Sequence, residues 1–390
     1  MKRKCFLTDS VVDVFYESDW YLEGIGKRSI VFGISKESGL VMQIPQISID
    51  ENWNWYKNNA GYTNPGRGGE PSLLTKRDVD RQINIIKDSL DHFPVSVFQV
   101  GCSDGYTLNS FRQAGAQKVT GVDPSSDAHR LAKRKYNIDY YNTTVEKLDI
   151  KEKFDLIILT HVLEHLYNPK DTLEKCWKMQ NENGLLLIEV PLLDNIESCS
   201  PVYFSFEHIN YFSEKTLIWT LEICGYKPFV ITKIMDRNSY PVITIVAKRS
   251  YGINLDIERK NDYQQTKLFV DNVLHVINNR WEKSKEIIIR EVQKDIPLFI
   301  YGFGTHSTQL FDTFPELKNY NIHGFIDSDK NKWNKKLLGY QCFSPKTYKF
   351  PHKCQILISS FDCEEEIYSF LKENYFSEYD FKIIRLYHND

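Results

Sequence analysis

A glycine-bearing turn between two short apolar runs has the residue types that bind a nucleotide cofactor. The run Val97–Val100 is followed by Gly101–Gly105, and a second run, Val119–Val122, ends at Asp123. Apolar, β-branched runs of this length indicate buried strands. Glycines let a ligand approach the backbone closely, and an acid at the end of the next strand can accept hydrogen bonds from ribose hydroxyls. These residues predict half of an open α/β nucleotide-binding sheet.

The glycine spacing leaves two cofactor classes open. A dinucleotide site has three glycines in G-x-G-x-x-G, with the pyrophosphate at the helix N-terminus. Here Gly101 and Gly105 carry Asp104 between them, where a phosphate would bind, and its charge would repel a pyrophosphate. That acid tolerates a ligand with an amino group and a sulfonium. The turn resembles motif I of class I S-adenosylmethionine (SAM) methyltransferases, acid-x-G-x-G-x-G, although Gln99 replaces the leading acid and Ser103 the middle glycine.

The sequence after Asp123 resembles the same family in the order of its elements. A run that starts with Phe154-Asp155 and ends in H-x-L-E-H resembles the family's fourth strand. The other expected elements are a helix at Ser126–Tyr136, a short strand at Asp139–Tyr141, a helix at Pro169–Met179 and a strand at Leu185–Val190.

The resemblance implies SAM as cofactor and places its contacts on specific residues. Gly101 and Gly105 would pass beneath the methionine part, Asp123 would bind the ribose, and Val145 with Glu146 would bracket the adenine. The full set of expected cofactor contacts is Gln99, Gly101, Cys102, Ser103, Gly105, Asp123, Pro124, Val145, Glu146, Thr160 and His161. By contrast, His165 at the start of the next turn is more often structural in this fold.

A second run of residues could supply acid–base chemistry. Methyl transfer requires an aligned nucleophile that loses a proton, and an imidazole titrates near neutral pH. The run Tyr203–Ser213 resembles the E-H-x-x-Y-F-S signature of the three-domain sugar methyltransferases, which implies His208 as base and Glu207 as its partner. Members that methylate carbon have a tyrosine and a histidine before this pair, where this chain has Ser205 and Phe206. The pair could also simply cap the following helix.

The flanking regions resemble the outer domains of that sugar methyltransferase family. Its N-terminal domain binds zinc through paired cysteines, but this chain keeps only Cys5 there, so we expect no metal site. The aromatic segment Trp53–Tyr56 either caps the substrate pocket or packs the small domain. Near the C-terminus, Gly302, Gly304 and Asp327 repeat the glycine-then-acid pattern. They would hold the nucleotide part of a substrate or serve the architecture alone.

Composition narrows the function classes. The chain has 390 residues, a net charge of −3 and eight cysteines without a C-x-x-C pair. The charge disfavours nucleic acid and anionic membranes as partners, and the scattered cysteines predict reduced thiols. No apolar run approaches the length of a membrane span, and the basic N-terminus lacks the apolar core of a signal peptide. We therefore expect a cytoplasmic protein.

We predict an α/β protein with a class I methyltransferase Rossmann-like sheet, a small β-rich N-terminal domain and a second Rossmann-like α/β C-terminal domain. The expected domains cover residues 1–75, 76–248 and 296–390, with connecting helices at 249–295. The expected function is SAM-dependent methylation of a sugar or nucleotide-sugar, on oxygen slightly in preference to carbon, with no nucleic-acid partner. Two alternatives remain, a degenerate methyltransferase fold that acts as a scaffold and an NAD-dependent Rossmann enzyme. The sequence does not fix the oligomeric state.

Overall fold

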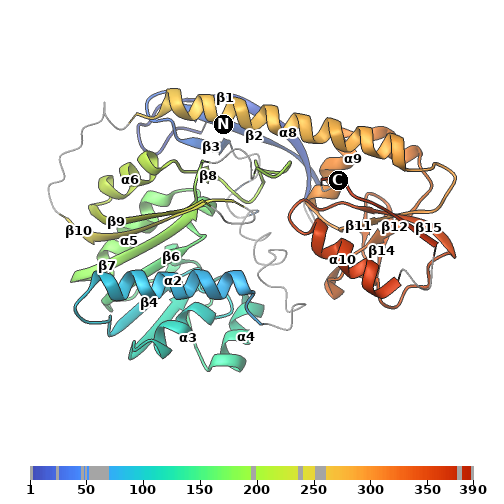
Figure 1. The fold of residues 1–390 in the computed structure, drawn as a ribbon. Helices are drawn as coiled ribbons and strands as arrows, with labels where there is room; N and C mark the ends of the chain where they lie inside the picture. The colour runs from blue at the N-terminus through green and yellow to red at the C-terminus, as the bar shows by residue number, and fades with distance from the viewer. Residues whose placement is uncertain are drawn as a thin grey trace. The chain divides into compact units, whose positions relative to one another are not determined.

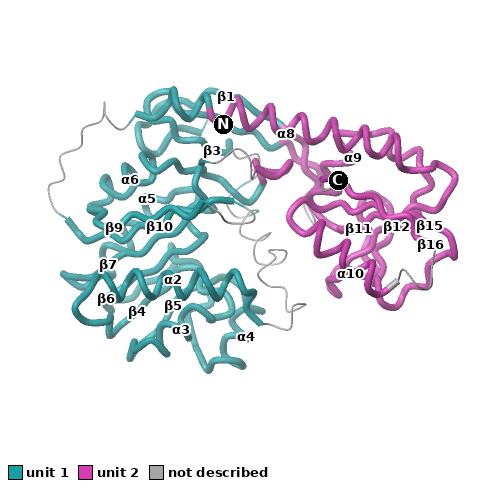
Figure 2. The backbone as a smooth tube through the Cα atoms, in the orientation of Figure 1, with its two compact units in different colours: residues 1–17, 30–195, 206–268 teal, residues 18–29, 196–205, 269–390 magenta. Residues whose placement is uncertain are grey.

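The structure is a computed structural model, and it describes residues 3–22, 26–44, 48, 51, 70–194, 199–235, 240–250, 261–375 and 380–387. The chain forms two compact units (Figure 2). The first comprises residues 1–17, 30–195 and 206–268, and the second comprises 18–29, 196–205 and 269–390. The aromatic segment Trp53–Tyr56 falls outside the described residues. The boundaries expected at residues 75, 248 and 295 remain predictions.

A six-stranded sheet forms the centre of the first unit (Figure 1), in the order β5-β4-β6-β7-β10-β9. The first four strands run parallel, and β10 is antiparallel to both β7 and β9. The chain moves from β4 outward to β5 and then to β6 on the other side of β4, so a crevice opens at the carboxyl ends of these strands. The bounds are β4 Ser96–Val100, β5 Lys118–Val122, β6 Phe154–Thr160, β7 Gln180–Pro191, β9 Tyr226–Ile234 and β10 Val242–Arg249.

Alternating side chains of the strands fill two cores, one on each face of the sheet. In β6, Ile157 and Leu159 belong to one apolar cluster, whereas Leu156 and Ile158 belong to the other. A strand covered on both faces is apolar throughout, which explains the uninterrupted run that the sequence shows here. The helices of this unit are α2 Leu73–Ser89, α3 Tyr106–Gln113, α4 Ser126–Tyr136, α5 Pro169–Lys178 and α6 Glu214–Ile223.

Side-chain caps start several of these helices where the sequence places serine. The hydroxyls of Ser72, Ser125 and Ser213 accept hydrogen bonds from the backbone N–H groups three residues further on. Each such bond satisfies one of the free donors of a helix's first turn. The short 3₁₀ turns η3 Val145–Lys147 and η4 Leu163–His165 follow at the sheet edge that carries the site.

The expected order of strands and helices across residues 97–190 is confirmed, with local differences. The strand expected at Asp139–Tyr141 is reduced to an isolated bridge between Val122 and Tyr141. Two residues before it, Asn137 ends α4 in the left-handed conformation. The strand expected at Leu185–Val190 is longer, because β7 runs from Gln180 to Pro191.

The N-terminal segment forms a four-stranded sheet in the order β1-β2-β3-β8. Its bounds are β1 Val12–Leu22, β2 Gly26–Ser35, β3 Val41–Ile44 and β8 Asn210–Tyr211. The last strand comes from the Tyr203–Ser213 run, because Val41 pairs with Tyr211 and Met42 with Asn210. The N-terminal sheet is thus completed by the segment that carries Glu207 and His208.

The second unit contains a second sheet, in the order β13-β14-β12-β11-β15-β16, parallel except for the pair β13–β14 (Figure 1). The strands are β11 Leu298–Tyr301, β12 Ile322–Ile326, β13 Lys336–Leu337, β14 Tyr340–Phe343, β15 Lys353–Ile358 and β16 Asp380–Ile384. The helices are α8 Tyr263–Glu291, α9 Thr305–Thr313 and α10 Glu364–Tyr375, with 3₁₀ turns η6 Pro315–Asn319 and η7 Lys330–Lys332. None of the helices in the described part of the chain is long and apolar enough to cross a membrane.

Candidate functional site

The turn after β4 has a backbone that only small residues fit. Gly101 has φ +68°, and a Cβ added to it would lie 2.5 Å from Cγ2 of Val162. Gly105 has φ +77°, and its added Cβ would lie 3.0 Å from Cβ of Ala132. Ser103, at the position of the missing middle glycine, also has a positive φ of 43°. The turn therefore keeps a glycine-like path, held in place because the hydroxyl of Tyr140 donates to the Ser103 carbonyl at 2.7 Å.

The carboxylate of Asp123 is fixed beside this turn. It accepts hydrogen bonds from the backbone N–H groups of Ser103 at 2.9 Å and Ser125 at 2.8 Å. Burial raises the pKa of Asp123, whereas these two hydrogen bonds favour its charged form. Each carboxylate oxygen has two lone pairs, so a rigidly held Asp123 can still accept from a ligand's hydroxyls.

The first turn of α3 does not offer an empty anion site. Asp104 lies before this helix, and its carboxylate accepts a hydrogen bond from the backbone N–H of Tyr106 at 3.1 Å. A pyrophosphate at this place would meet a negative charge and would have to displace that bond. The geometry agrees with the sequence argument against a dinucleotide.

The other expected cofactor residues divide into buried and accessible groups. Gln99, Cys102 and Val145 are at most 3% exposed. The thiol of Cys102 belongs to the core, and burial raises its pKa far above the ordinary value. The side-chain oxygen of Gln99 makes no hydrogen bond within the described residues. The accessible positions at the same sheet edge are Pro124, Glu146 and Thr160, of which Glu146 accepts from the hydroxyl of Thr172 at 3.2 Å.

The turn after β6 brings histidines and carboxylates together. His161 has φ +53°, with Nδ1 3.4 Å from Oε1 of Glu164 and Nε2 3.7 Å from Oε1 of Glu189. Burial favours the neutral acid of Glu164, but the neighbouring His165 and His161 outweigh it and hold its pKa at about 2. Glu164 is thus an ionised carboxylate at only 1% exposure.

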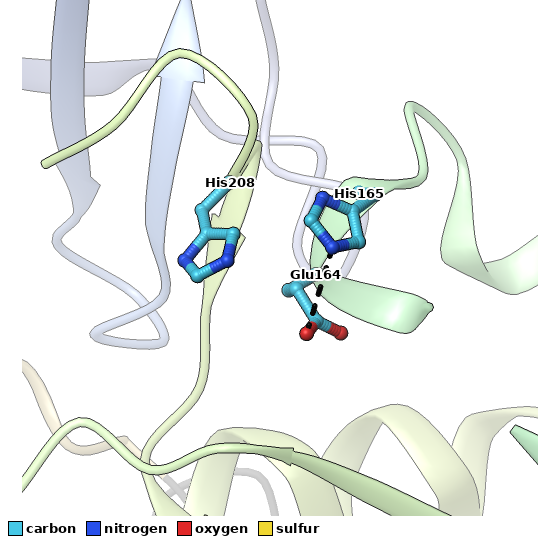
Figure 3. Close-up of side chains that lie close together, drawn as sticks. All are labelled: Glu164, His165 and His208. Carbon is cyan, nitrogen blue, oxygen red and sulfur yellow. Dashed lines mark ion pairs between the residues drawn. The ribbon is translucent and has the colours of Figure 1, made fainter. Parts of the chain in front are cut away.

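His208 lies next to this turn (Figure 3). The rings of His165 and His208 have centroids 5.0 Å apart. Nδ1 of His165 lies 2.8 Å from the backbone oxygen of Glu207, and its Nε2 lies 3.8 Å from Oε1 of Glu164. Burial and the nearby His165 lower the pKa of His208 to about 3, so its imidazole is neutral at ordinary pH. Glu207 supports the cluster through its backbone carbonyl, and burial raises the pKa of its side chain.

No sequence motif predicted a function for Glu164, and none included Arg81 or Glu189. Arg81 on α2 donates to Oε2 of Glu189 and to the hydroxyl of Thr244, both at 2.8 Å. Glu189 is fully buried in β7, with the Arg81 guanidinium as its ion-pair partner. The sequence carries one signal for this pair, since Glu189 is an acidic residue inside the apolar run of β7. A buried carboxylate requires a nearby cation.

The N-terminal strand β3 holds the His208 segment by backbone and side-chain bonds. The backbone N–H of Gln43 donates to the Ile209 carbonyl at 2.8 Å, and its side-chain amide donates to the Phe206 carbonyl at 3.0 Å. Asn210 then donates to the Leu166 carbonyl at 2.7 Å, one residue after the turn that carries Glu164 and His165. These bonds join the two histidine-bearing segments to one support.

The second unit repeats the glycine-then-acid geometry. Oδ2 of Asp327 accepts from the backbone N–H of Phe303 at 2.9 Å, inside the turn that contains Gly302 and Gly304. It also accepts from Nζ of Lys332 at 3.0 Å. The carboxylate is therefore already paired with a cation, which gives it a structural role without a ligand.

Two protein families match separate parts of this chain by sequence. Residues 76–229 match the family model described as "Methyltransferase domain", and residues 296–384 match the one described as "C2185-like, N-terminal". Among solved structures, the 1,6-didemethyltoxoflavin-N1-methyltransferase of Burkholderia thailandensis has 15% identity and a TM-score of 0.44, covering 60% of this chain and 100% of that one.

Two curated relatives match a shorter stretch. The chain is 34% identical over 97 residues to the ubiquinone biosynthesis O-methyltransferase of Rhodopseudomonas palustris (strain BisA53). It is 36% identical over 97 residues to the protein of the same name from Bradyrhizobium diazoefficiens. Each match covers 24% of this chain and 38% of the relative. Residues 76–229 are therefore similar to a methyltransferase domain, and the chain spans about two fifths of the length of the curated relatives that it matches.

Proposed function

We propose that this protein transfers the methyl group of SAM to an oxygen atom of a small, carbohydrate-derived molecule, such as a nucleotide-linked or capsular sugar. One observation carries the proposal. The cofactor turn at Gly101 packs against Val162, which stands between His161 and Glu164. The residues expected to bind SAM and the histidine cluster that could accept a proton therefore lie side by side at one edge of the sheet.

The proposed reaction is an in-line displacement. The acceptor oxygen forms a bond to the methyl carbon, the carbon–sulfur bond breaks, and its electron pair stays on sulfur as S-adenosylhomocysteine. Most of the rate enhancement then comes from alignment of the two reactants. The hydroxyl proton passes to a ring nitrogen of His208, which lies in one cluster with Glu164 and His165.

Two observations support oxygen as the acceptor atom. The curated relatives are named O-methyltransferases. In addition, Ser205 and Phe206 stand where the carbon-methylating sugar enzymes have a tyrosine and a histidine. A carbohydrate acceptor rests on the Glu207–Ser213 signature.

Calorimetric titration of the full chain with SAM, and separately with NAD, tests the cofactor half of the proposal. We expect micromolar SAM binding that is lost in Asp123→Ala, and no NAD binding. Transfer of labelled methyl groups to pools of sugars and nucleotide-sugars then tests the acceptor, with His208→Gln as the variant that binds SAM but does not transfer. SAM binding without transfer to any hydroxyl acceptor would contradict the proposed reaction and favour the scaffold alternative. Gln99 and Ser103 support that alternative, because they replace the acid and the middle glycine of motif I.

A further inference from the structure

Three side chains of the candidate site have the composition of a metal centre. Glu164, His165 and His208 each offer one ligand atom, and these atoms all lie within 4.8 Å of one another (Figure 3). Methyl transfer itself needs one proton acceptor, so it leaves the convergence of two imidazoles on a buried carboxylate unexplained. We propose that Glu164, His165 and His208 bind one divalent cation of the zinc type.

The orientation of His165 is the first argument. Its Nδ1 lies 2.8 Å from the backbone oxygen of Glu207, and a carbonyl oxygen can only accept. Nδ1 therefore carries a hydrogen, and the ring turns its other nitrogen, Nε2, toward Glu164. Nε2 lies 3.8 Å from Oε1 of that carboxyl group. Histidines that bind metals commonly donate their second N–H to a backbone carbonyl in this way.

The state of Glu164 is the second argument. The side chain is 1% exposed, and neither carboxylate oxygen has a hydrogen-bond partner within the described residues. Two imidazole nitrogens lie nearby, Nδ1 of His161 at 3.4 Å and Nε2 of His165 at 3.8 Å. Burial of a carboxyl group without hydrogen-bond partners is costly, and a bound cation removes that cost. A cation among the three residues would contact the Glu164 carboxylate and one ring nitrogen of each histidine.

The donor set indicates which cation fits. Two imidazole nitrogens and one carboxylate oxygen are the ligands of many catalytic zinc sites, which keep a fourth position open. In a tetrahedral zinc site the ligand atoms stand about 3.3 Å apart, so the 3.8 Å pair needs little adjustment and the 4.8 Å limit needs small side-chain rotations. Hard cations such as Mg²⁺ prefer oxygen ligands alone.

An open position on the cation would take the acceptor oxygen. A bound zinc ion lowers the pKa of an oxygen ligand. It would therefore promote loss of the proton from the acceptor hydroxyl, which is the role of His208 in the metal-free protein. This consequence rests on the proposed function, whereas binding of the cation does not. His208 would then be a ligand, and the released proton would pass to water.

The test measures metal binding directly. The full chain is freed of metal with a chelator and dialysed against Zn²⁺, and bound zinc is then counted by mass spectrometry. Co²⁺ absorption reports the coordination. We expect one equivalent of zinc in the wild-type chain and at least roughly tenfold weaker binding in Glu164→Gln, His165→Asn and His208→Gln. His165→Asn keeps a donor for the Glu207 carbonyl, so it separates metal binding from folding. His92→Gln, at an exposed histidine, is the matched control.

The outcomes separate this inference from the proposed function. Equal zinc binding in the wild type and all three variants, or none in the wild type, would overturn it. SAM titrations on the same metal-free samples report the cofactor site independently. Zinc binding without SAM binding would support the metal site while the methyltransferase proposal fails, and methyl transfer in a chain that binds no zinc would do the reverse.

Discussion

Nδ1 of His165 donates a hydrogen bond to the backbone oxygen of Glu207 at 2.8 Å, across 42 residues of sequence. The bond joins the turn after β6 to the segment that carries His208, so it serves both stability and chemistry. Asparagine can place a donor at the position of Nδ1 but has no atom at the position of Nε2. We expect His165→Asn to keep the free energy of unfolding near that of the wild type, and His165→Ala to lose about 1 kcal/mol.

Both His165 variants should have reduced methyl-transfer turnover, because both lack Nε2. Urea denaturation followed by circular dichroism measures the first effect, and transfer assays under saturating SAM measure the second. Equal destabilisation of the two variants would mean that the bond to Glu207 does not hold the turn.

Arg81 and Glu189 form a second long-range pair, at 2.8 Å, with Glu189 fully buried. Removing one partner of such a pair leaves an uncompensated charge, which costs about 3–5 kcal/mol. We expect Arg81→Met to lower the free energy of unfolding by that order. The double variant Arg81→Met with Glu189→Leu should recover much of the loss, because no buried charge remains. Arg77→Met, at an exposed position of the same helix, is the control and should stay within about 0.5 kcal/mol of the wild type.

The sequence was sufficient for what local pattern determines. Apolar runs located β4 and β5 to within one residue and the start of β6 at Phe154, and the glycines located the cofactor turn. Contacts between distant segments were not predictable from such patterns. The pairing of Met42 with Asn210, and of Arg81 with Glu189, depends on the tertiary arrangement. Glu189 is recognisable as an acid inside an apolar run, but neither spacing nor residue type identifies Arg81 as its partner.

The histidine cluster shows the same limit within one motif. The H-x-L-E-H ending placed His161 beside the cofactor edge, but the backbone decided which side chains met. The positive φ of His161 and the 3₁₀ turn at Leu163–His165 direct Glu164 into the protein and His165 toward Glu207. The spacing of apolar residues could not distinguish these orientations. The sequence pattern therefore indicated a structural role for His165.

Substitution of Gly101 tests the packing between the two turns of the site. An alanine there meets two costs, about 1–2 kcal/mol for the left-handed backbone and about 1–3 kcal/mol for overlap with Val162, 2.5 Å from the added Cβ. We expect Gly101→Ala to be destabilised by their sum and to bind SAM weakly. Adding Val162→Ala should relieve the overlap but not the backbone strain. A double-mutant cycle on urea denaturation isolates the difference, and strictly additive effects would contradict the contact.

Asp123 should couple SAM binding to pH. Its carboxylate is held by the N–H groups of Ser103 and Ser125, and burial raises its pKa above that of an ordinary aspartate. Ribose hydroxyls donate to the ionised form, so SAM affinity should be constant near neutral pH. It should then fall as acid protonates Asp123, at a higher pH than an ordinary aspartate would require. Calorimetry across this range measures the profile.

The controls for Asp123 use two substitutions. Asp123→Asn removes the titration, so its weaker SAM binding, by roughly tenfold or about 1.4 kcal/mol, should show no acid-dependent fall. Asp123→Ala also removes the acceptor for both N–H groups and should bind still more weakly. An acid-dependent loss that is the same in Asp123→Asn and the wild type would exclude this carboxylate as the titrating group.

The stability of the fold should depend on pH through Asp155. Its pKa is lowered in the folded chain, whereas the pKa of Asp123 is raised. The carboxylate of Asp155 accepts from the backbone N–H and hydroxyl of Ser96, both at 2.9 Å, and from the amide of Asn181 at 2.6 Å, so it ties together the starts of β4, β6 and β7. Burial opposes ionisation, but the hydrogen bonds from Asn181 and Ser96 outweigh it and lower the pKa. A carboxyl group whose pKa is lower in the folded chain stabilises the fold above its unfolded pKa of about 3.9, and this stability is lost as the pH falls through the folded pKa.

We therefore expect Asp155→Ala to lower the free energy of unfolding by about 2 kcal/mol at neutral pH, since hydrogen bonds to a charged group are lost. The difference from the wild type should shrink once the pH falls below about 4, because protonation then weakens the same bonds in the wild type. Urea denaturation at neutral and acidic pH measures both values, with Asp91→Ala at an exposed position as control. A difference that stays constant with pH would show that shape, and not the charge of Asp155, joins the three strands.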